Sequence, residues 1–172
     1  MDTPGSTRVG AIAPGTSGDP RAESSRIYLH PGKLFLAREV CLVTTILGSC
    51  VAVCLWDDVR RFGGINHFLL PAWAGGDQAS SRFGNVAIEE LIRELLGLGA
   101  RRQQLRAKVF GGACVLEALQ NGAHHLGQKN IDMAYRLLAE ERIPVVGGDV
   151  GGKRGRKLMF RTDDGQAWVK LL

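Results

Sequence analysis

The chain has 172 residues, of which 45% are hydrophobic and 23% are charged. These values are typical of a globular domain with one sizeable core, and no apolar run approaches the roughly 18 residues that a membrane-spanning helix requires. The formal net charge of +5 allows acidic partners, but only 6% of the residues are aromatic, which argues against a nucleic-acid-binding surface. We therefore expect neither membrane insertion nor a nucleic-acid partner.

The cysteines and the first residues together indicate a compartment. The N-terminus lacks the apolar core of a signal peptide, so we expect a cytoplasmic location. In that reducing environment Cys41, Cys50, Cys54 and Cys114 are expected to be thiols rather than disulfides.

The composition changes near residue 25. Residues 1–25 are rich in Gly, Pro, Ser, Thr and Ala without periodicity, which predicts a disordered tail. Residues 26–172 are predicted to form a single domain. Within it, apolar and β-branched runs predict strands over residues 40–47, 50–56, 64–70, 105–110, 143–146, 157–162 and 166–171. Two short apolar pieces at 27–29 and 34–36 are separated by a turn signal at 30–32.

Two longer segments have the apolar spacing of amphipathic helices, at residues 83–98 and 128–141. Asn85 is a candidate cap for the first helix. A third segment, 115–119, is ambiguous and precedes a turn signal at 121–122. With strands in consecutive groups, the pattern predicts an α+β fold, a layered sandwich of mostly antiparallel or mixed sheet with two main helices packed on it.

The strand pattern also predicts local pairings. The strands at 40–47, 50–56 and 64–70 are expected to form a meander of adjacent antiparallel strands. The last two strands are expected to form a hairpin about Asp163-Asp164-Gly165, in which Asp-Gly is the turn signal.

A cysteine follows a sharp corner between two of the β-rich runs. Gly48 and Ser49 separate the runs, and Cys50 comes directly after them. Backbone N–H groups at such a corner can bind an oxyanion beside a nucleophilic sulfur. A thiolate is the reactive form, so this cysteine requires a base.

His67 is the candidate base, because pairing of the strands at 50–56 and 64–70 brings it within reach of Cys50. A base also needs an orienting group. Asp57 is a candidate by residue type, and Thr44 and Thr45 are candidates by position. The residues alone leave a structural alternative open, in which Cys50 and His67 are ordinary core residues.

The sequence argues against two other kinds of site, a zinc site and a phosphate-binding loop. Cys50 and Cys54 lie on a strand rather than in a knuckle turn, so the spacing does not favour zinc. Residues 147–154 nearly spell a phosphate-binding loop, but Arg154 replaces the required hydroxyl and a hairpin follows instead of a helix.

Several motifs in one order resemble the CheD family of chemoreceptor glutamine deamidases, over about residues 26–172. They are Thr44 with Leu47-Gly48-Ser49-Cys50-Val51-Ala52-Val53, Asp57, Gly63-Gly64-x-x-His67 with Leu70-Pro71, Ala107-Lys108-x-Phe110-Gly111-Gly112-Ala113, Gly127-x-x-Asn130 and Asp149-x-Gly151-Gly152-x-x-Gly155-Arg156.

This resemblance implies an enzyme that hydrolyses glutamine side-chain amides of methyl-accepting chemotaxis receptors to glutamate through a cysteine thioester. It implies Cys50, His67 and Thr44 as catalytic residues, with Thr44 as the group that orients His67. Backbone groups at Gly48 and Ser49 would stabilise the oxyanion. No metal and no organic cofactor is implied.

A substrate or partner surface is also expected, whose basic residues are inferred from their charge and not from the resemblance. The resemblance leaves a second role open. We expect a substrate or partner surface at Phe110, Gly111, Gly112, Lys153, Arg154 and Arg156. The alternative role is a non-catalytic adaptor that binds a CheC-type phosphatase or a receptor. A monomer is expected in either case.

Overall fold

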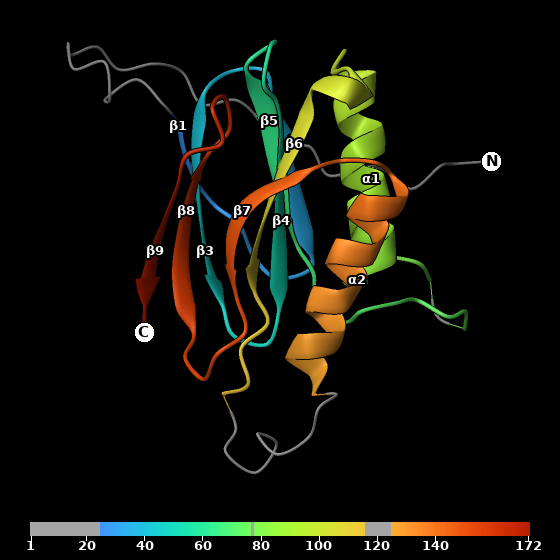
Figure 1. Cartoon of the computed structure of the whole chain (residues 1–172), viewed down its shortest axis with the longest axis vertical. Helices are drawn as coiled ribbons and strands as arrows, with labels where there is room; N and C mark the ends of the chain where they lie inside the picture. Colours follow the sequence, from blue (N-terminus) through green and yellow to red (C-terminus); the bar gives the residue numbers. More distant parts are fainter. Residues whose placement is uncertain (1–24, 77, 116–124) are drawn as a thin grey trace.

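Two β-sheets stack face to face, and two helices cover the outer side of one of them (Figure 1). The computed structural model describes residues 25–76, 78–115 and 125–172. Apart from residues 25 and 115, the expected tail over 1–25 and the segment 115–119 with its turn at 121–122 lie outside the described residues. The layers confirm the predicted α+β sandwich.

The first sheet has four strands among the described residues, in the order β1-β3-β8-β9. β1 runs parallel to β3, and the other neighbours are antiparallel. The β8–β9 pair is the predicted C-terminal hairpin. The strands of this four-stranded sheet are β1 (Ser25–Tyr28), β3 (Cys41–Leu47), β8 (Arg156–Arg161) and β9 (Ala167–Leu171).

The second sheet has five strands in the described part of the chain, in the order β2-β5-β4-β6-β7. Only β6 and β7 are parallel. The strands of this five-stranded sheet are β2 (Lys33–Ala37), β4 (Val51–Asp57), β5 (Phe62–His67), β6 (Leu105–Gly111) and β7 (Val145–Val150).

Both predicted helices are present, and a short 3₁₀ turn, η1 (Arg102–Gln104), precedes β6. The two α-helices are α1 (Gly84–Gly97) and α2 (Leu126–Glu140). Asn85 is not the cap of α1, because Phe83 holds that position. The Asn85 side chain instead accepts from the N–H of Trp73 and donates to its carbonyl, which ties the preceding loop to the helix.

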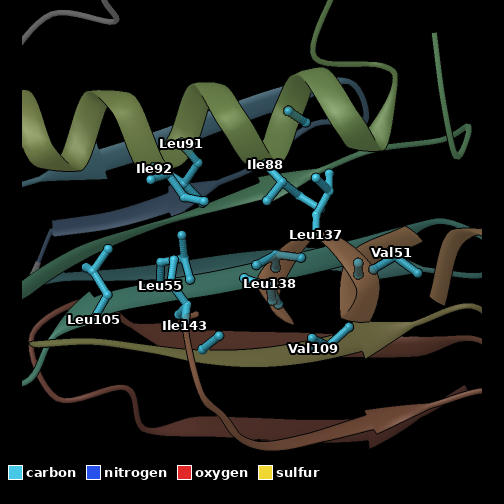
Figure 2. Close-up of a cluster of buried hydrophobic side chains, with 14 of the residues drawn as sticks. Val51, Leu55, Ile88, Leu91, Ile92, Leu105, Val109, Leu137, Leu138 and Ile143 are labelled. Carbon is cyan, nitrogen blue, oxygen red and sulfur yellow. The ribbon is translucent and has the colours of Figure 1, made fainter. Parts of the chain in front are cut away.

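The core has two parts, one on each side of the five-stranded sheet. Figure 2 shows the first, where side chains of α1 and α2 pack on β4 and β6. The second part fills the space between the sheets. Full burial of each large aliphatic side chain contributes about 1.5–3 kcal/mol, so both parts of the core stabilise the five-stranded sheet that lies between them.

The predicted meander is wrong at its first step. β4 and β5 pair as antiparallel neighbours, but β3 belongs to the other sheet. Alternate residues of β3 are buried, as in a sheet with one solvent face, whereas every residue of β4 is buried because β4 is covered on both faces. The corner at residues 48–50 therefore crosses from one sheet to the other.

Candidate active site

Hydrogen bonds hold all three carbonyls of the inter-sheet corner. The carbonyl of Gly48 accepts from the N–H of Ala113, at 2.8 Å, and that of Cys50 accepts from Gly112, also at 2.8 Å. Between them, the carbonyl of Ser49 accepts from the side-chain amide of Asn130 on α2, at 3.0 Å. The corner is thereby fixed from two directions, by the segment after β6 and by the first turns of α2.

This bracing leaves the amide side of the corner open. In the described part of the chain, no backbone carbonyl accepts from the N–H of Ser49 or Cys50. Preorganised N–H groups beside a nucleophile are what an oxyanion hole requires. The geometry is thus compatible with the predicted oxyanion site around Gly48 and Ser49.

Close backbone approach explains the glycines opposite the corner. Gly111 and Gly112 have φ values of 105° and 73°, in the region that favours glycine. A Cβ at Gly111 would overlap the carbonyl of Cys50, and one at Gly112 would overlap Ile131.

The predicted partner surface at Phe110, Gly111 and Gly112 is therefore corrected, because all three residues are buried. They lie under the corner and shape it.

Cys50 and His67 lie on the same face of the five-stranded sheet. Cys54 pairs with Ile65, and Val51 bridges Phe68, so one register runs along β4 and β5. That register makes Cys50 the diagonal neighbour of His67. Such pairs have Cβ atoms about 7–8 Å apart or somewhat closer, within reach of a long side chain.

The imidazole of His67 is held by the other sheet. Its Nδ1 lies 2.8 Å from the hydroxyl of Thr45, and that hydroxyl also donates to the carbonyl of Leu29 at 2.8 Å. A hydroxyl has one proton, and a carbonyl can only accept. Thr45 therefore accepts from Nδ1, which places the proton of the neutral ring on Nδ1 and leaves Nε2 with its lone pair.

Nε2 of His67 is buried and has no hydrogen-bond partner among the described residues. His67 itself is only 1% exposed. A bare ring nitrogen on the face shared with a cysteine has the arrangement of a general base toward a thiol.

The threonine that contacts His67 is Thr45, and not Thr44 as the resemblance implied. Side chains alternate along a strand, so Thr45 points between the sheets with Val43, and Thr44 points to the opposite face. This result corrects the expected hydrogen bond of Thr44. Thr45 was a candidate by its position in the sequence. The alternation of buried residues along β3, which places Thr45 on the same face as Val43, is the signal that favours Thr45 over Thr44.

Burial sets the protonation of the pair. It raises the pKa of the Cys50 thiol, an effect that the cysteine's own backbone N–H partly offsets. Burial also lowers the pKa of His67 to about 4. At neutral pH these shifts favour a thiol and a neutral imidazole.

Asp57, the alternative orienter, lies at the far end of β4 from the corner. Its carboxylate accepts from the backbone N–H groups of Val59, Arg60 and Arg101. Burial alone would raise the pKa of Asp57, but these N–H donors outweigh burial and lower it. Asp57 is a turn-stabilising residue and does not reach His67.

The predicted basic surface is present only in part. Lys153 and Arg154 are exposed. Arg156 is 2% exposed, so its placement on a partner surface is corrected. Its guanidinium binds the carboxylate of Asp149 at 2.7 Å and the carbonyl of Gly151, which fixes the glycine-rich loop.

A small cavity of about 140 Å³ lies beside the corner, lined by Ser49, residues 113–115 and residues 125–127. Asn130 lies next to this cavity. Asn130 was named from the sequence only as part of a family motif, and its role at the corner was not predicted. Its amide donates both to the carbonyl of Ser49 and to that of Leu69, each at 3.0 Å. Asn130 therefore links the cysteine corner to the segment that follows His67.

No group of three His, Cys, Asp or Glu side chains in the described part of the chain could hold a metal ion. None of the helices in this part is long and apolar enough to cross a membrane. Cys41 and Cys54 are buried, as expected of core residues.

Comparison with known proteins gives a consistent family. Residues 69–171, more than half of the chain, match the family model described as CheD chemotactic sensory transduction. A protein of Anaeromyxobacter dehalogenans named "probable chemoreceptor glutamine deamidase CheD 1" is 54% identical, over 86% of this chain and 85% of its own length.

Two further relatives have the same name without the number. That of Trichlorobacter lovleyi is 46% identical, over 81% of this chain and 86% of the relative. The relative from Sulfurimonas denitrificans is 40% identical, over 87% of this chain and 96% of the relative. Among solved structures, the Bacillus licheniformis hypothetical protein YfiH covers 63% of this chain and 46% of its own at 17% identity, with a TM-score of 0.40, too low to support an argument.

Proposed function

Because this chain belongs to the CheD family, we propose that it is a protein-glutamine deamidase that acts on methyl-accepting chemotaxis receptors. The single observation that most supports the chemistry is the Thr45–His67 contact. It fixes the tautomer in which Nε2 is the acceptor on the face shared with Cys50.

The reaction begins when Nε2 of His67 takes the proton of the Cys50 thiol. The thiolate attacks the amide carbon of a glutamine side chain, and a tetrahedral intermediate forms with negative charge on its oxygen. The N–H groups of Ser49 and Cys50, which donate to no backbone carbonyl among the described residues, stabilise that oxyanion.

Protonated His67 next gives its proton to the leaving nitrogen, so ammonia departs and a thioester remains. A water molecule, deprotonated by the same Nε2, attacks the thioester and releases glutamate and the Cys50 thiol. The sum is one amide and one water converted to one carboxylic acid and one ammonia. Neither a metal nor an organic cofactor takes part.

Thr45 acts as a positioning residue in this scheme. When His67 becomes an imidazolium, both ring nitrogens donate, and Nδ1 continues to donate to the Thr45 hydroxyl. The same hydrogen bond therefore supports the neutral and the charged ring, which is what a base that cycles twice per turnover requires.

The test uses a purified chemoreceptor cytoplasmic fragment and mass spectrometry. Each deamidation adds about one mass unit, because an amide NH₂ is replaced by OH. We expect conversion with the wild-type protein and none with Cys50→Ala, whereas the Cys54→Ala variant, which lacks a buried cysteine of β4, retains it. Equal conversion by wild type and Cys50→Ala would exclude the proposed nucleophile.

The proposal extends to the setting of the enzyme. We place it in the cytoplasm as a monomer that also binds a CheC-type phosphatase, on the basis of family membership. Light scattering on the purified protein, alone and with a CheC-type protein, tests the last two points. A dimer alone, or no complex with several such proteins, would contradict them.

A further inference from the structure

A row of four residues crosses the solvent-facing side of the four-stranded sheet. The strand registers place Tyr28 opposite Thr44, Thr44 opposite Met159, and Met159 opposite Trp168. Tyr28 and Trp168 are 50% and 45% exposed, although aromatic side chains usually gain from burial. We call this side of the sheet the outer face.

Rows that contain basic residues flank the row from Tyr28 to Trp168 on both sides, and we call them the basic rows. Two residues along the strands in one direction lie Arg26, Leu42 and Arg161, and two residues in the other direction lie Ile46, Lys157 and Lys170. Consecutive residues on one face of a strand are about 7 Å apart. The outer face is thus an apolar band with positive charge about 7 Å to either side.

The charge on the outer face is mostly unpaired. None of the strands β1, β3, β8 and β9 contains an acidic residue. Arg161 pairs with Asp163, but Arg26, Lys157 and Lys170 have no ion-pair partner in the part of the chain that the structure describes. A surface of this kind complements a ligand with an apolar stripe and carboxylates on both sides.

We propose that the outer face binds an amphipathic α-helix of a partner protein, with acidic residues on both sides of its apolar stripe. The two flanking rows lie about 14 Å apart, and an α-helix with its side chains is about 10–12 Å wide. A helix laid along the row places its flanking carboxylates over the two basic rows. Tyr, Trp, Met and Arg are the residues enriched at the core of protein interfaces.

The proposed surface is separate from the active site. Thr44 and Thr45 are consecutive, yet Thr45 contacts His67 between the sheets and Thr44 lies in the middle of the outer face. A helix bound there leaves Cys50 and the cavity beside the corner uncovered. The inference therefore goes beyond the deamidase chemistry and does not depend on it.

The binding test uses a designed helical peptide as the probe. It has 21 residues, Leu at the two apolar heptad positions and Glu at the positions on either side, and a fluorescein label. A matched peptide has Lys in place of every flanking Glu. Fluorescence anisotropy with the full-length protein is expected to show saturable binding of the Glu peptide, which weakens as salt is raised, and at least tenfold weaker binding of the Lys peptide.

Variants localise the site. Trp168→Ala and the double variant Lys157→Glu with Lys170→Glu are each expected to weaken binding of the Glu peptide at least tenfold. Tyr135→Ala, an exposed aromatic residue on α2, and Arg101→Glu with Lys129→Glu, two exposed basic residues elsewhere, serve as matched controls without effect. Deamidation of a short glutamine peptide is measured in parallel, so failure of the active site is distinguished from failure of the outer face.

Three results would overturn the proposal. The first is equal binding of the Glu and Lys peptides, and the second is weakening by the control variants as much as by the outer-face variants. The third is occupancy by something else: binding of phosphatidylglycerol vesicles without binding of the Glu peptide would assign the surface to a membrane, and self-association lost in Trp168→Ala would assign it to a second copy of this chain.

Discussion

The hydroxyl of Thr45 lies 2.8 Å from Nδ1 of His67 and donates to the carbonyl of Leu29. This pair of contacts joins the two sheets at the active site. It also decides which nitrogen of the ring carries the proton, because a hydroxyl that donates to a carbonyl can only accept from the imidazole.

Replacement of Thr45 by Val keeps the shape of the side chain and removes its hydroxyl. We expect kcat for deamidation to fall at least about tenfold, since general-base catalysis contributes 10²–10⁴-fold and requires the correct tautomer. Thr45→Ser restores the hydroxyl and is expected to recover most of the rate. Steady-state rates on a receptor fragment provide the measurement.

Thr44→Val is the matched control for that experiment, because Thr44 lies on the outer face. We expect a rate on a short glutamine peptide close to that of the wild type. If Thr44→Val abolishes turnover while Thr45→Val preserves it, the assignment of the positioning role to Thr45 is wrong.

Asn130 offers a second test of how the site is positioned. Asn130→Ala removes two hydrogen bonds, to the carbonyls of Ser49 and Leu69, each contributing about 0.5–1.5 kcal/mol to stability. Because these bonds hold the segments that carry Cys50 and follow His67, we also expect a lower kcat and slower alkylation of Cys50 by iodoacetamide.

Asn85→Ala supplies the comparison, since Asn85, which lies on α1, makes two similar hydrogen bonds to the backbone of Trp73 in the preceding loop. It is expected to reduce the free energy of unfolding by a similar amount while kcat per folded molecule stays unchanged. Equal kinetic effects of the two variants would show that Asn130 stabilises the fold without positioning the site.

Acid is expected to destabilise the protein through His67. Burial lowers its pKa from 6.5 to about 4, so between these pH values the unfolded chain binds a proton that the folded protein does not. The contribution of the neutral His67 to the free energy of unfolding is therefore fully present above pH 6.5, and it is lost as the pH falls toward 4. The difference corresponds to about 3 kcal/mol.

Urea unfolding of wild type and His67→Gln at pH 7.5 and pH 4.5 measures this contribution. Carboxylates titrate in both proteins, so the comparison isolates the histidine. We expect the wild type to lose more stability than the variant on acidification. A larger loss in the variant would mean that His67 is protonated in the folded state.

Gly111→Ala tests the close approach at the corner. The new Cβ meets the carbonyl of Cys50, and alanine is disfavoured at a φ of 105°. We expect a loss of more than about 1 kcal/mol in the free energy of unfolding, together with reduced activity. Gly97→Ala in α1 is the control, since nothing lies within 4 Å of its added Cβ, and it is expected to preserve both. Unchanged stability of Gly111→Ala would contradict the observed packing.

Most of the strands, both helices and the layered fold class could be predicted from the sequence, because hydrophobic periodicity and turn residues are local signals. β1 and β2 were expected only as short apolar pieces, because four or five residues carry little periodicity. The sheet to which each strand belongs is not a local property. β3 and β4 are consecutive β-rich runs joined by a short corner, which resembles a hairpin, and only the burial of β4 on both faces separates them.

The position of the site could be predicted from the sequence, but the contacts within it could not. Cys50 at a corner and His67 on the paired strand followed from residue types and spacing. The choice of Thr45 over Thr44 depends on which face of β3 turns inward, and the buried positions of Phe110 and Arg156 depend on tertiary packing. A basic residue next to a glycine-rich loop is usually exposed, but Arg156, the first residue of β8, is held inside by Asp149.

The most direct test of the proposed chemistry is the trapping of the thioester. A chemoreceptor fragment is mixed with the protein, quenched in acid within milliseconds to seconds, and examined by intact-mass and peptide mass spectrometry. We expect an acyl adduct on Cys50 that forms before glutamate accumulates and that is absent in Cys50→Ala. Deamidation without any adduct, or at an undiminished rate in Cys50→Ala, would contradict a cysteine nucleophile at this corner.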